Sequence, residues 1–161
     1  MRHRKRRGQL KVSPSHLRAM RRNLVASLFT HGRVTTTVAK AKAFRPFAEK
    51  LITLAREGNR GKAEGTPEGN ASHLHAVRRA ARLMPHKPAV RRLFRDVAPA
   101  VGERPGGYTR IIRLGTSRLG DRAPQAMFML VDTPGEDEEA DAAATATAKK
   151  GKGKKEKAAS K

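Results

Sequence analysis

Residues 33–55 read RVTTTVAKAKAFRPFAEKLITLA, and this stretch decides which kind of fold the chain can adopt. Its first four residues, Arg33 to Thr36, are too few and too β-branched for a helix and predict a short strand or extended connector. Thr37 stands where a helix N-cap is expected. Apolar residues then recur at the helical repeat for about five turns. This stripe consists of Ala41, Phe44, Ala48, Leu51, Ile52 and Ala55. We predict one long amphipathic helix, with Phe44 and Phe47 in the core.

Three further helices are predicted from apolar periodicity and from helix start and stop signals. The first begins after an N-cap at Ser13 and ends at Gly32, and its stripe is Leu17, Met20, Leu24 and Leu28. Residues 58–72, punctuated by Gly and Asn, are predicted to be a loop. The next helix carries the stripe Leu74, Val77, Ala81 and Met84 and ends at Pro85 and Pro88. A shorter helix covers Ala89–Val97, and Pro99 breaks the chain after it.

Two strands, Tyr108–Leu114 and Gln125–Asp132, are separated by a Gly-, Arg- and Asp-rich connection that suits an antiparallel hairpin. The second strand is apolar at successive positions, so the face that points inward stays open. These elements predict an α+β fold, a single compact two-layer domain of about four helices packed on a small, mostly antiparallel sheet. The domain would span residues 13–134, after a basic N-terminal arm at residues 1–12. Residues 135–161, acidic and then Lys-rich, predict a disordered tail.

The charge balance indicates a polyanionic partner. The 161 residues include 36 Lys and Arg against 14 Asp and Glu, a formal net charge of +22, and no acidic residue precedes Glu49. Such an excess repels itself in a compact domain unless a partner neutralises it. The arm cannot bury enough apolar surface to order itself, so we expect it to take a fixed path only along that partner.

The start of the helix after Thr37 is a candidate anion site. Lys40, Lys42 and Arg45 crowd the helix end whose macrodipole favours negative charge, where exposed cations cost about 0.3–1 kcal/mol each. A phosphate would resolve the conflict, because free backbone N–H groups and nearby cations bind anions. The alternative is that the long side chains simply extend into water.

Other chemistries find no support in the sequence. With no Cys, disulfides and Cys-based zinc sites are excluded, and the six His lack the spacing of a helical zinc site. Glycines 58, 61 and 65 with Lys62 do not match the nucleotide-binding pattern. No nucleophile, base and acid trio is visible, so we expect no enzyme activity, cofactor, metal or small-molecule substrate. The apolar stretches are too short to span a membrane, and we expect a soluble, cytosolic protein.

Four motifs in order along the chain resemble the bacterial large-subunit ribosomal protein seventeen family. They are the opening MRHRK, VTTTVAKAKAFR from Val34 to Arg45, GGYTRI from Gly106 to Ile111, and RLGDRAP from Arg118 to Pro124. The resemblance runs from Met1 to about Asp132. An Arg-rich, acid-poor start is also typical of organellar transit peptides, but a match beginning at Met1 makes a cleaved leader unexpected. Residues 61–70 and those after Pro134 depart from the family pattern.

The resemblance implies a structural protein of the 50S ribosomal subunit, in the cytoplasm. It would bind folded 23S ribosomal RNA and support assembly and translation, next to other large-subunit proteins such as ribosomal protein thirty-two, without forming a homo-oligomer. Phosphate and shape contacts are expected, because side chains cannot enter the deep groove of A-form RNA. A nucleoid-associated DNA-binding protein stays open as the alternative. The RNA contacts are predicted at Arg2, His3, Arg4, Lys5, Arg6, Arg7, Lys11, His16, Arg18, Arg21, Arg22, Thr35, Thr36, Thr37, Lys40, Lys42, Arg45, Gly106, Gly107, Tyr108, Arg110, Arg118 and Arg122.

Overall fold

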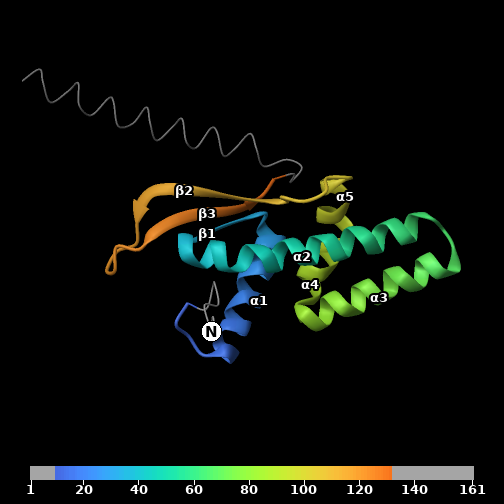
Figure 1. The fold of residues 1–161 in the computed structure, drawn as a ribbon, viewed down its shortest axis with the longest axis horizontal. Coiled ribbons are helices and arrows are strands. Elements are labelled where there is room, and N and C mark those ends of the chain that lie inside the picture. The colour runs from blue at the N-terminus through green and yellow to red at the C-terminus, as the bar shows by residue number, and fades with distance from the viewer. Residues whose placement is uncertain (1–9, 132–161) are drawn as a thin grey trace, which may run out of the picture.

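The computed structural model describes residues 10–131, which contain the helices and strands of the predicted α+β domain (Figure 1). The elements are α1 (Pro14–His31), β1 (Arg33–Thr37), α2 (Val38–Ala63), α3 (Pro67–Leu83), α4 (Lys87–Arg92), the π-helical segment η1 (Leu93–Val97), α5 (Ala98–Val101), β2 (Thr109–Ser117) and β3 (Pro124–Leu130). Because α4, η1 and α5 follow one another without a break, they form one helical stretch. The predicted tail, and all of the predicted arm but its last residues, lie outside the described part.

The sheet has the order β1-β3-β2, and both pairings are antiparallel. Strand β3 is therefore central and pairs with a strand on each side. Its side chains alternate, with Ala126, Phe128 and Leu130 buried and the residues between them half-buried. This pattern answers the question that the sequence left open, because these three side chains point toward the helices.

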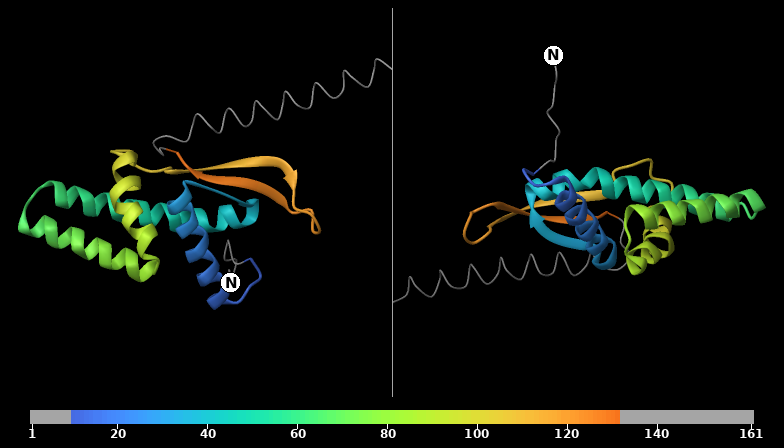
Figure 2. Two further views of the ribbon diagram at one scale, coloured as in Figure 1. Left: turned by 180° about the vertical axis from the view of Figure 1, so that it is seen from behind. Right: turned by 90° about the horizontal axis from the view of Figure 1, so that it is seen from below.

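Helices cover one face of the sheet (Figures 1 and 2). Helices α1 and α2 lie against that face, whereas no described helix covers the opposite one. The α2–α3 pair extends away from the sheet toward one end of the molecule, and the β2–β3 hairpin extends toward the other. None of the helices in residues 10–131 has the length and apolar character needed to cross a membrane.

Helix α2 is the central element of the core, as its sequence predicts. All six residues of the predicted stripe are at most 1 % exposed, and they share one cluster with β3 through Phe128 and Leu130. Phe44 is buried, and Phe47 packs at the edge of the cluster. Thr37 occupies the N-cap position, but its side chain makes no capping hydrogen bond. The predicted cap is therefore correct in position and wrong in mechanism.

Helix α1 begins and ends where the sequence predicts. The Ser13 side chain accepts a hydrogen bond from the His16 backbone N–H, and Gly32 ends the helix with a positive φ of 73°. The buried face differs from the predicted stripe, however. Its fully buried residues are Val25, Ala26, Leu28 and Phe29, whereas Leu17, Met20 and Leu24 are only partly buried. The helix faces the core mainly through its second half, because its first half extends beyond the sheet.

The loop predicted at residues 58–72 is wrong. Helix α2 continues to Ala63 and α3 begins at Pro67, with the Thr66 side chain accepting a hydrogen bond from the Gly69 N–H at 3.0 Å. Three glycines interpreted as loop punctuation instead let the two helices approach closely. A Cβ on Gly69 would lie 2.0 Å from the Gly61 carbonyl oxygen, and one on Gly58 would lie 2.7 Å from the Ala76 Cβ. Glycine is required here by close packing rather than by a turn.

The buried face of α3 is also offset from the predicted stripe. The residues buried against α2 are Gly69, Ala76 and Ala80, whereas Leu74 is 48 % exposed. Small residues occupy the interface because the helix axes are too close for leucine. A separate contact joins α2 to η1, because the Asn59 side-chain amide donates to the Phe94 carbonyl oxygen at 2.7 Å.

The positions of Pro88 and Pro99 explain why the helical stretch after α3 differs from the predicted one. Pro88 lies in the first turn of α4, and Pro99 lies in the first turn of α5, directly after η1. Proline is tolerated there because first-turn N–H groups have no helical partner. The predicted break at Pro99 is therefore wrong, and the helical stretch ends at Gly102, whose φ is 56°.

Adding one methyl group between α2 and α3 tests the glycine interface. In Gly69→Ala the new Cβ would collide with the Gly61 backbone, and such overpacking costs about 1–3 kcal/mol. We expect the free energy of unfolding to fall despite the higher helix propensity of alanine, measured by urea denaturation. Gly115→Ala is the matched control, because its Cβ would have no neighbour within 4 Å. Equal stability of the two variants would contradict the close approach.

Candidate nucleic-acid interface

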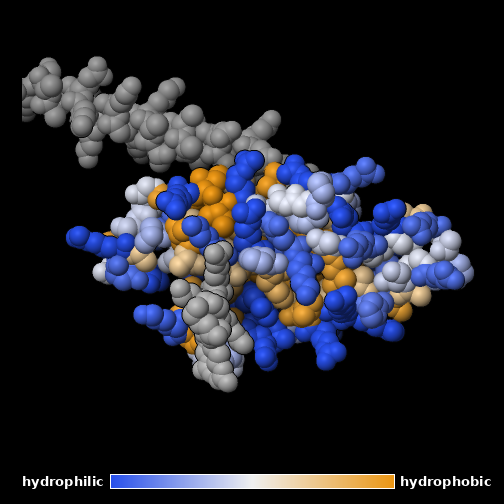
Figure 3. Space-filling view, in the orientation of Figure 1, coloured by the Kyte–Doolittle hydropathy of each residue, from blue (hydrophilic) through white to orange (hydrophobic). Residues whose placement is uncertain are grey.

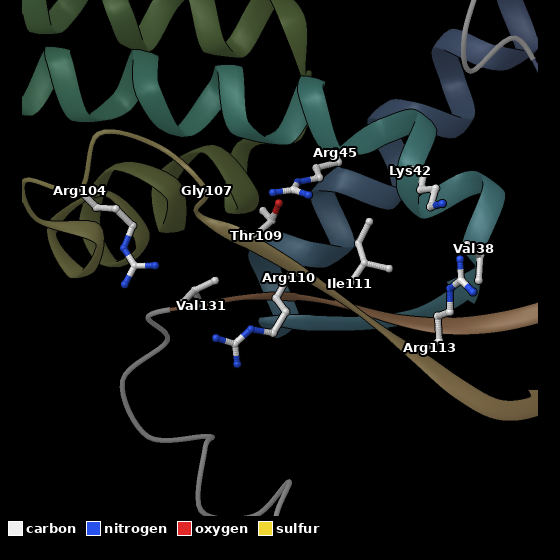
Figure 4. A pocket seen from close by; sticks show the side chains of 10 residues that line it. All are labelled: Val38, Lys42, Arg45, Arg104, Gly107, Thr109, Arg110, Ile111, Arg113 and Val131. Atoms are coloured by element: carbon white, nitrogen blue, oxygen red, sulfur yellow. The ribbon is translucent and has the colours of Figure 1, made fainter.

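A basic cleft lies between the first turns of α2 and strand β2 (Figure 4). Its volume is about 620 Å³, and half of its ten lining residues are Lys or Arg while none is acidic. The lining residues are Val38, Lys42, Arg45, Arg104, Gly107, Thr109, Arg110, Ile111, Arg113 and Val131. A concave surface with this composition suits an anionic ligand with several charges, such as a nucleic-acid backbone.

Strand β2 carries one wall of the cleft. Along the strand, Thr109 is buried, Ile111 is half-buried and Arg113 is exposed, all on the side that faces the helices. Side chains on one side of a strand recur every second residue, so the strand moves from core to solvent as it leaves α2. Arg113 is therefore exposed at the point where α2 no longer covers the strand. Arg110, between Thr109 and Ile111, adds a second exposed charge.

A polar link joins the two walls. The Thr109 hydroxyl donates to Glu49 Oε1 at 2.8 Å, and Arg45 Nε lies 3.0 Å from the same oxygen. Glu49 therefore fixes β2 to α2 and orients Arg45 at the cleft. It also neutralises part of the Arg45 charge. Lys42, Arg110 and Arg113 form no ion pair within residues 10–131, so their charges are available to a ligand.

The predicted anion site at the start of α2 forms one end of this cleft. The first turn of α2 contains no acidic residue, and the Thr37 side chain leaves the free N–H groups of that turn uncapped. Lys42 is exposed and lines the cleft beside Val38, while Lys40 is half-buried and does not line it. In Figure 4, Lys42 and Arg113 lie at the Val38 end, and Arg104 and Arg110 lie toward Val131.

The predicted contact residues of α1, together with Lys11 just before the helix, are divided between surface and interior. Lys11, His16 and Arg18 are exposed. In contrast, Arg22 Nε donates to the Leu83 carbonyl oxygen at 3.0 Å and so ties α1 to the end of α3. Arg22 therefore has an internal structural role, whatever its remaining N–H groups contact.

Arg21 lies over the Phe47 ring, with its guanidinium carbon 4.2 Å from the ring centroid. Its Nε is buried and has no hydrogen-bond partner within the described residues. Burial lowers the pKa of Arg21, and the positive charges of Arg22 and Arg18 lower it further. Burial against Phe47 is thus the main cost of placing a charge at Arg21, and the two neighbouring arginines add to it.

The β1 threonines lie beside the sheet surface. Thr35 is exposed, whereas Thr36 and Thr37 are half-buried. Thr35 pairs with Met127 and Thr37 with Gln125, which places both on the face without helices, while Thr36 pairs with the buried Ala126. The three threonines therefore do not share one surface.

The predicted contact at Tyr108 is corrected by its burial. Its side chain is 1 % exposed, and its hydroxyl accepts a hydrogen bond from Thr53 Oγ1 at 3.5 Å. Tyr108 directly precedes β2, and its ring is buried in the core, where it cannot reach a partner. Gly106 and Gly107 before it stay near the surface, and Gly107, with a φ of 70°, lines the cleft.

The turn between β2 and β3 has an internal ion pair. Arg118 Nε donates to Asp121 Oδ1 at 2.9 Å, a second Arg118 nitrogen contacts Asp121 Oδ2, and the Ala123 N–H donates to Asp121 Oδ1. Arg118 therefore shapes the turn. Arg122, with a φ of 51°, and Leu119, 97 % exposed, are presented to solvent by it.

The cleft includes two cations that the sequence did not predict, Arg104 and Arg113. Arg113 could have been found from strand alternation, because it shares a strand face with Thr109 and Ile111. Arg104 follows the helical stretch in an irregular segment, and no periodicity places it. The predicted residues Arg2, His3, Arg4, Lys5, Arg6 and Arg7 lie outside the described part of the chain.

Hydrophilic side chains are not confined to the cleft. Figure 3 shows hydrophilic side chains over most of one face, with an apolar area over the region of the sheet. Within residues 10–131, no group of three or more His, Asp or Glu side chains is arranged to hold a metal ion.

Comparison with known proteins gives one consistent result. The family model described as "Ribosomal protein L17" matches residues 20–131. A protein of Akkermansia muciniphila is 44 % identical over 139 residues, covering 86 % of this chain and 91 % of the relative. One of Geobacter sulfurreducens is 48 % identical over 132 residues, covering 82 % and 67 %. Both relatives carry the name "Large ribosomal subunit protein bL17".

The Arg118–Asp121 pair gives a pH prediction. The hydrogen bond from Arg118 and that from the Ala123 N–H lower the pKa of Asp121 to about 2. Because the folded-state pKa lies below the ordinary value of about 3.9, the pair supports the turn above that pH and is lost as the pH falls through about 2. We expect an NMR titration of the Asp121 carboxyl to show this midpoint. Arg118→Gln should raise it toward the ordinary value, and Arg122→Gln should not. A normal midpoint in the unmodified protein would contradict the pairing.

Proposed function

The chain belongs to the ribosomal protein L17 family, and we propose that within the large ribosomal subunit it binds and stabilises folded 23S ribosomal RNA. As a member of this family it is a structural component of the large subunit and not an enzyme. The observation that carries the RNA proposal is the cleft, with its five cations and no acidic lining residue.

The cleft suits a phosphate backbone rather than base edges. Arg110 and Arg113 present planar guanidinium groups that can bind phosphate oxygens in pairs, and Lys42 adds a point charge. The β2–α2 link through Glu49 holds the walls in place, so little ordering is needed on binding. Because A-form RNA hides its base edges in a deep groove, recognition would depend on phosphate positions and 2′-hydroxyl groups. Sequence specificity would be slight.

A second contact area is proposed at the start of α1, on His16 and Arg18 of the helix and on Lys11 just before it. These side chains are exposed, and the turn at Arg122 offers a further cation at the far end of the β2–β3 hairpin. Several separated areas of positive charge would let one small protein join several RNA segments, which is how it would support assembly.

Protein neighbours are part of the proposal. The face of the sheet without helices carries Met127, Met129 and the 42 % exposed Ile112, with Arg33 beside Met129. Apolar centres with arginine at the side are typical of protein contacts. On the basis of the family resemblance, we propose ribosomal protein thirty-two as one neighbour within the large subunit.

The alternative partner, chromosomal DNA, is distinguished by sedimentation. Lysate is separated on a density gradient at moderate salt, with and without DNase treatment. We expect the protein to migrate with large ribosomal subunits in both samples. Migration with DNA that DNase abolishes would contradict the proposed function.

Removing cleft charges tests the RNA contact. We expect the triple variant Lys42→Gln, Arg110→Gln and Arg113→Gln to bind large-subunit RNA more weakly. We also expect the slope of log K against log salt to become shallower by about 0.7–0.9 for each lost phosphate contact. Filter binding over a salt series measures both.

The control variant removes the same charge from α3. Arg78, Arg79 and Arg82 are exposed, so their triple replacement by Gln changes net charge equally without touching the cleft. An equal loss of affinity in both variants would show that net charge, and not the cleft, binds RNA.

A further inference from the structure

The described chain ends at the rim of the basic cleft. Val131 is one of the ten lining residues, and its N–H donates to the Tyr108 carbonyl oxygen at 3.0 Å, directly beside Gly107 of the lining. This bond continues the pairing of β3 with β2 beyond Leu130 and holds Val131 at one end of the cleft (Figure 4). Whatever follows Val131 in sequence is thus tethered to the cleft.

The sequence that follows is the most acidic in the protein. Residues 135–141 read GEDEEAD and contain five of the 14 carboxylates of the whole chain. Glu136 is five residues beyond Val131, and an extended chain of this length spans up to roughly 17 Å. The acidic residues are therefore within reach of the cleft, whereas the lysines lie further along, from Lys149 onward.

Charge and geometry are complementary. The cleft offers Lys42, Arg110 and Arg113 without ion pairs inside the described residues, and carboxylates bind guanidinium groups in the same paired geometry as phosphates do. We infer that in the free protein the acidic segment 136–141 occupies the cleft and takes the place of RNA phosphate. This inference rests on the proposed function in assigning RNA to the same cleft.

Tethering makes this contact effective and also reversible. Short linkers give effective concentrations in the millimolar range, so the segment competes well with weakly bound nucleic acid. Exposed ion pairs are individually weak and are screened by salt, so an RNA that matches several contact areas at once displaces the segment. The acidic segment would then reduce binding to wrong or unfolded RNA while barely affecting the correct site.

A spin-label experiment on the full-length protein tests the docking directly. The chain has no Cys, so Ala140→Cys gives a single attachment point for a nitroxide. At low salt we expect broadening of backbone amide signals in residues 107–113 and at Lys42, with little effect on α3. The broadening should disappear at about 1 M salt, where the screening length is about 3 Å.

The control carries the same label and lacks the charges. It combines Glu136→Gln, Asp137→Asn, Glu138→Gln, Glu139→Gln and Asp141→Asn. Loss of the cleft broadening in this variant supports the inference. Equal broadening with and without the carboxylates, or none at low salt in the unmodified protein, would overturn it.

RNA binding separates this inference from the proposed function. We expect the neutralised segment to raise affinity for a short, non-cognate RNA several-fold, and the gain to vanish when Lys42, Arg110 and Arg113 are also Gln. A gain that persists in the cleft variant would reflect net charge alone and would overturn the inference. If the spin label broadens the cleft signals but the cleft variant binds RNA as tightly as the unmodified protein, the docking stands and the proposed function is overturned. If the label broadens no cleft signal but the cleft variant binds RNA more weakly, the proposed function stands and the docking of the acidic segment is overturned.

Discussion

The packing of α2 against the sheet is the contact on which the rest of the structure depends. Its stripe from Ala41 to Ala55 forms one buried cluster with Phe128 and Leu130 of the central strand. The same helix provides Lys42 and Arg45 to the cleft, and Glu49, one turn later, fixes β2 across it. Core and cleft are therefore not independent, because one rigid helix positions both. A change that rotated α2 would move the cations together with the hydrophobic stripe.

Positive charge is the second constraint, and the fold distributes it unevenly. Arg22, Arg45 and Arg118 are engaged with acceptors of the protein itself. Arg22 connects α1 to the end of α3, Arg45 pairs with Glu49 one turn later on α2, and Arg118 shapes a turn. Others, such as Arg18, Arg110 and Arg113, form no ion pair within residues 10–131. Because exposed pairs contribute little to stability, the paired arginines matter mainly for orientation. The basic residues therefore have two different roles, and their excess is not spread evenly over the surface.

The sequence predicts the elements of this fold better than the contacts between them. The stripe of α2 is correct because its large apolar residues recur over many turns and leave one possible buried face. Gly58, Gly61 and Gly69 were wrongly predicted to lie in a loop. Glycine is common both in loops and where two helices pack closely, and the sequence does not show which partner helix lies opposite. The offset of α3 follows from the same cause, since its interface is built from alanine and glycine, which carry little hydrophobic signal.

The candidate site divides in a similar way. Lys42, Arg45 and Arg110 were predicted and do line the cleft, whereas Tyr108 belongs to the core, because a motif shows which residues are present and not which way they point. Arg104 was missed since its place depends on how an irregular segment returns to the sheet. The Arg2–Arg7 predictions concern residues outside the described part and stay predictions.

The strand order has a consequence for how the protein is made. Synthesis proceeds from the N-terminus, and β3, the middle strand, is the last of the described strands to be translated. Until it leaves the translating ribosome, β1 and β2 have no partner for their backbone groups and the apolar side of α2 has no sheet to cover it. Helices can form early from local contacts, but the sheet closes only after β3 has been translated. The strand that arrives last is thus the one that completes the architecture of the described domain.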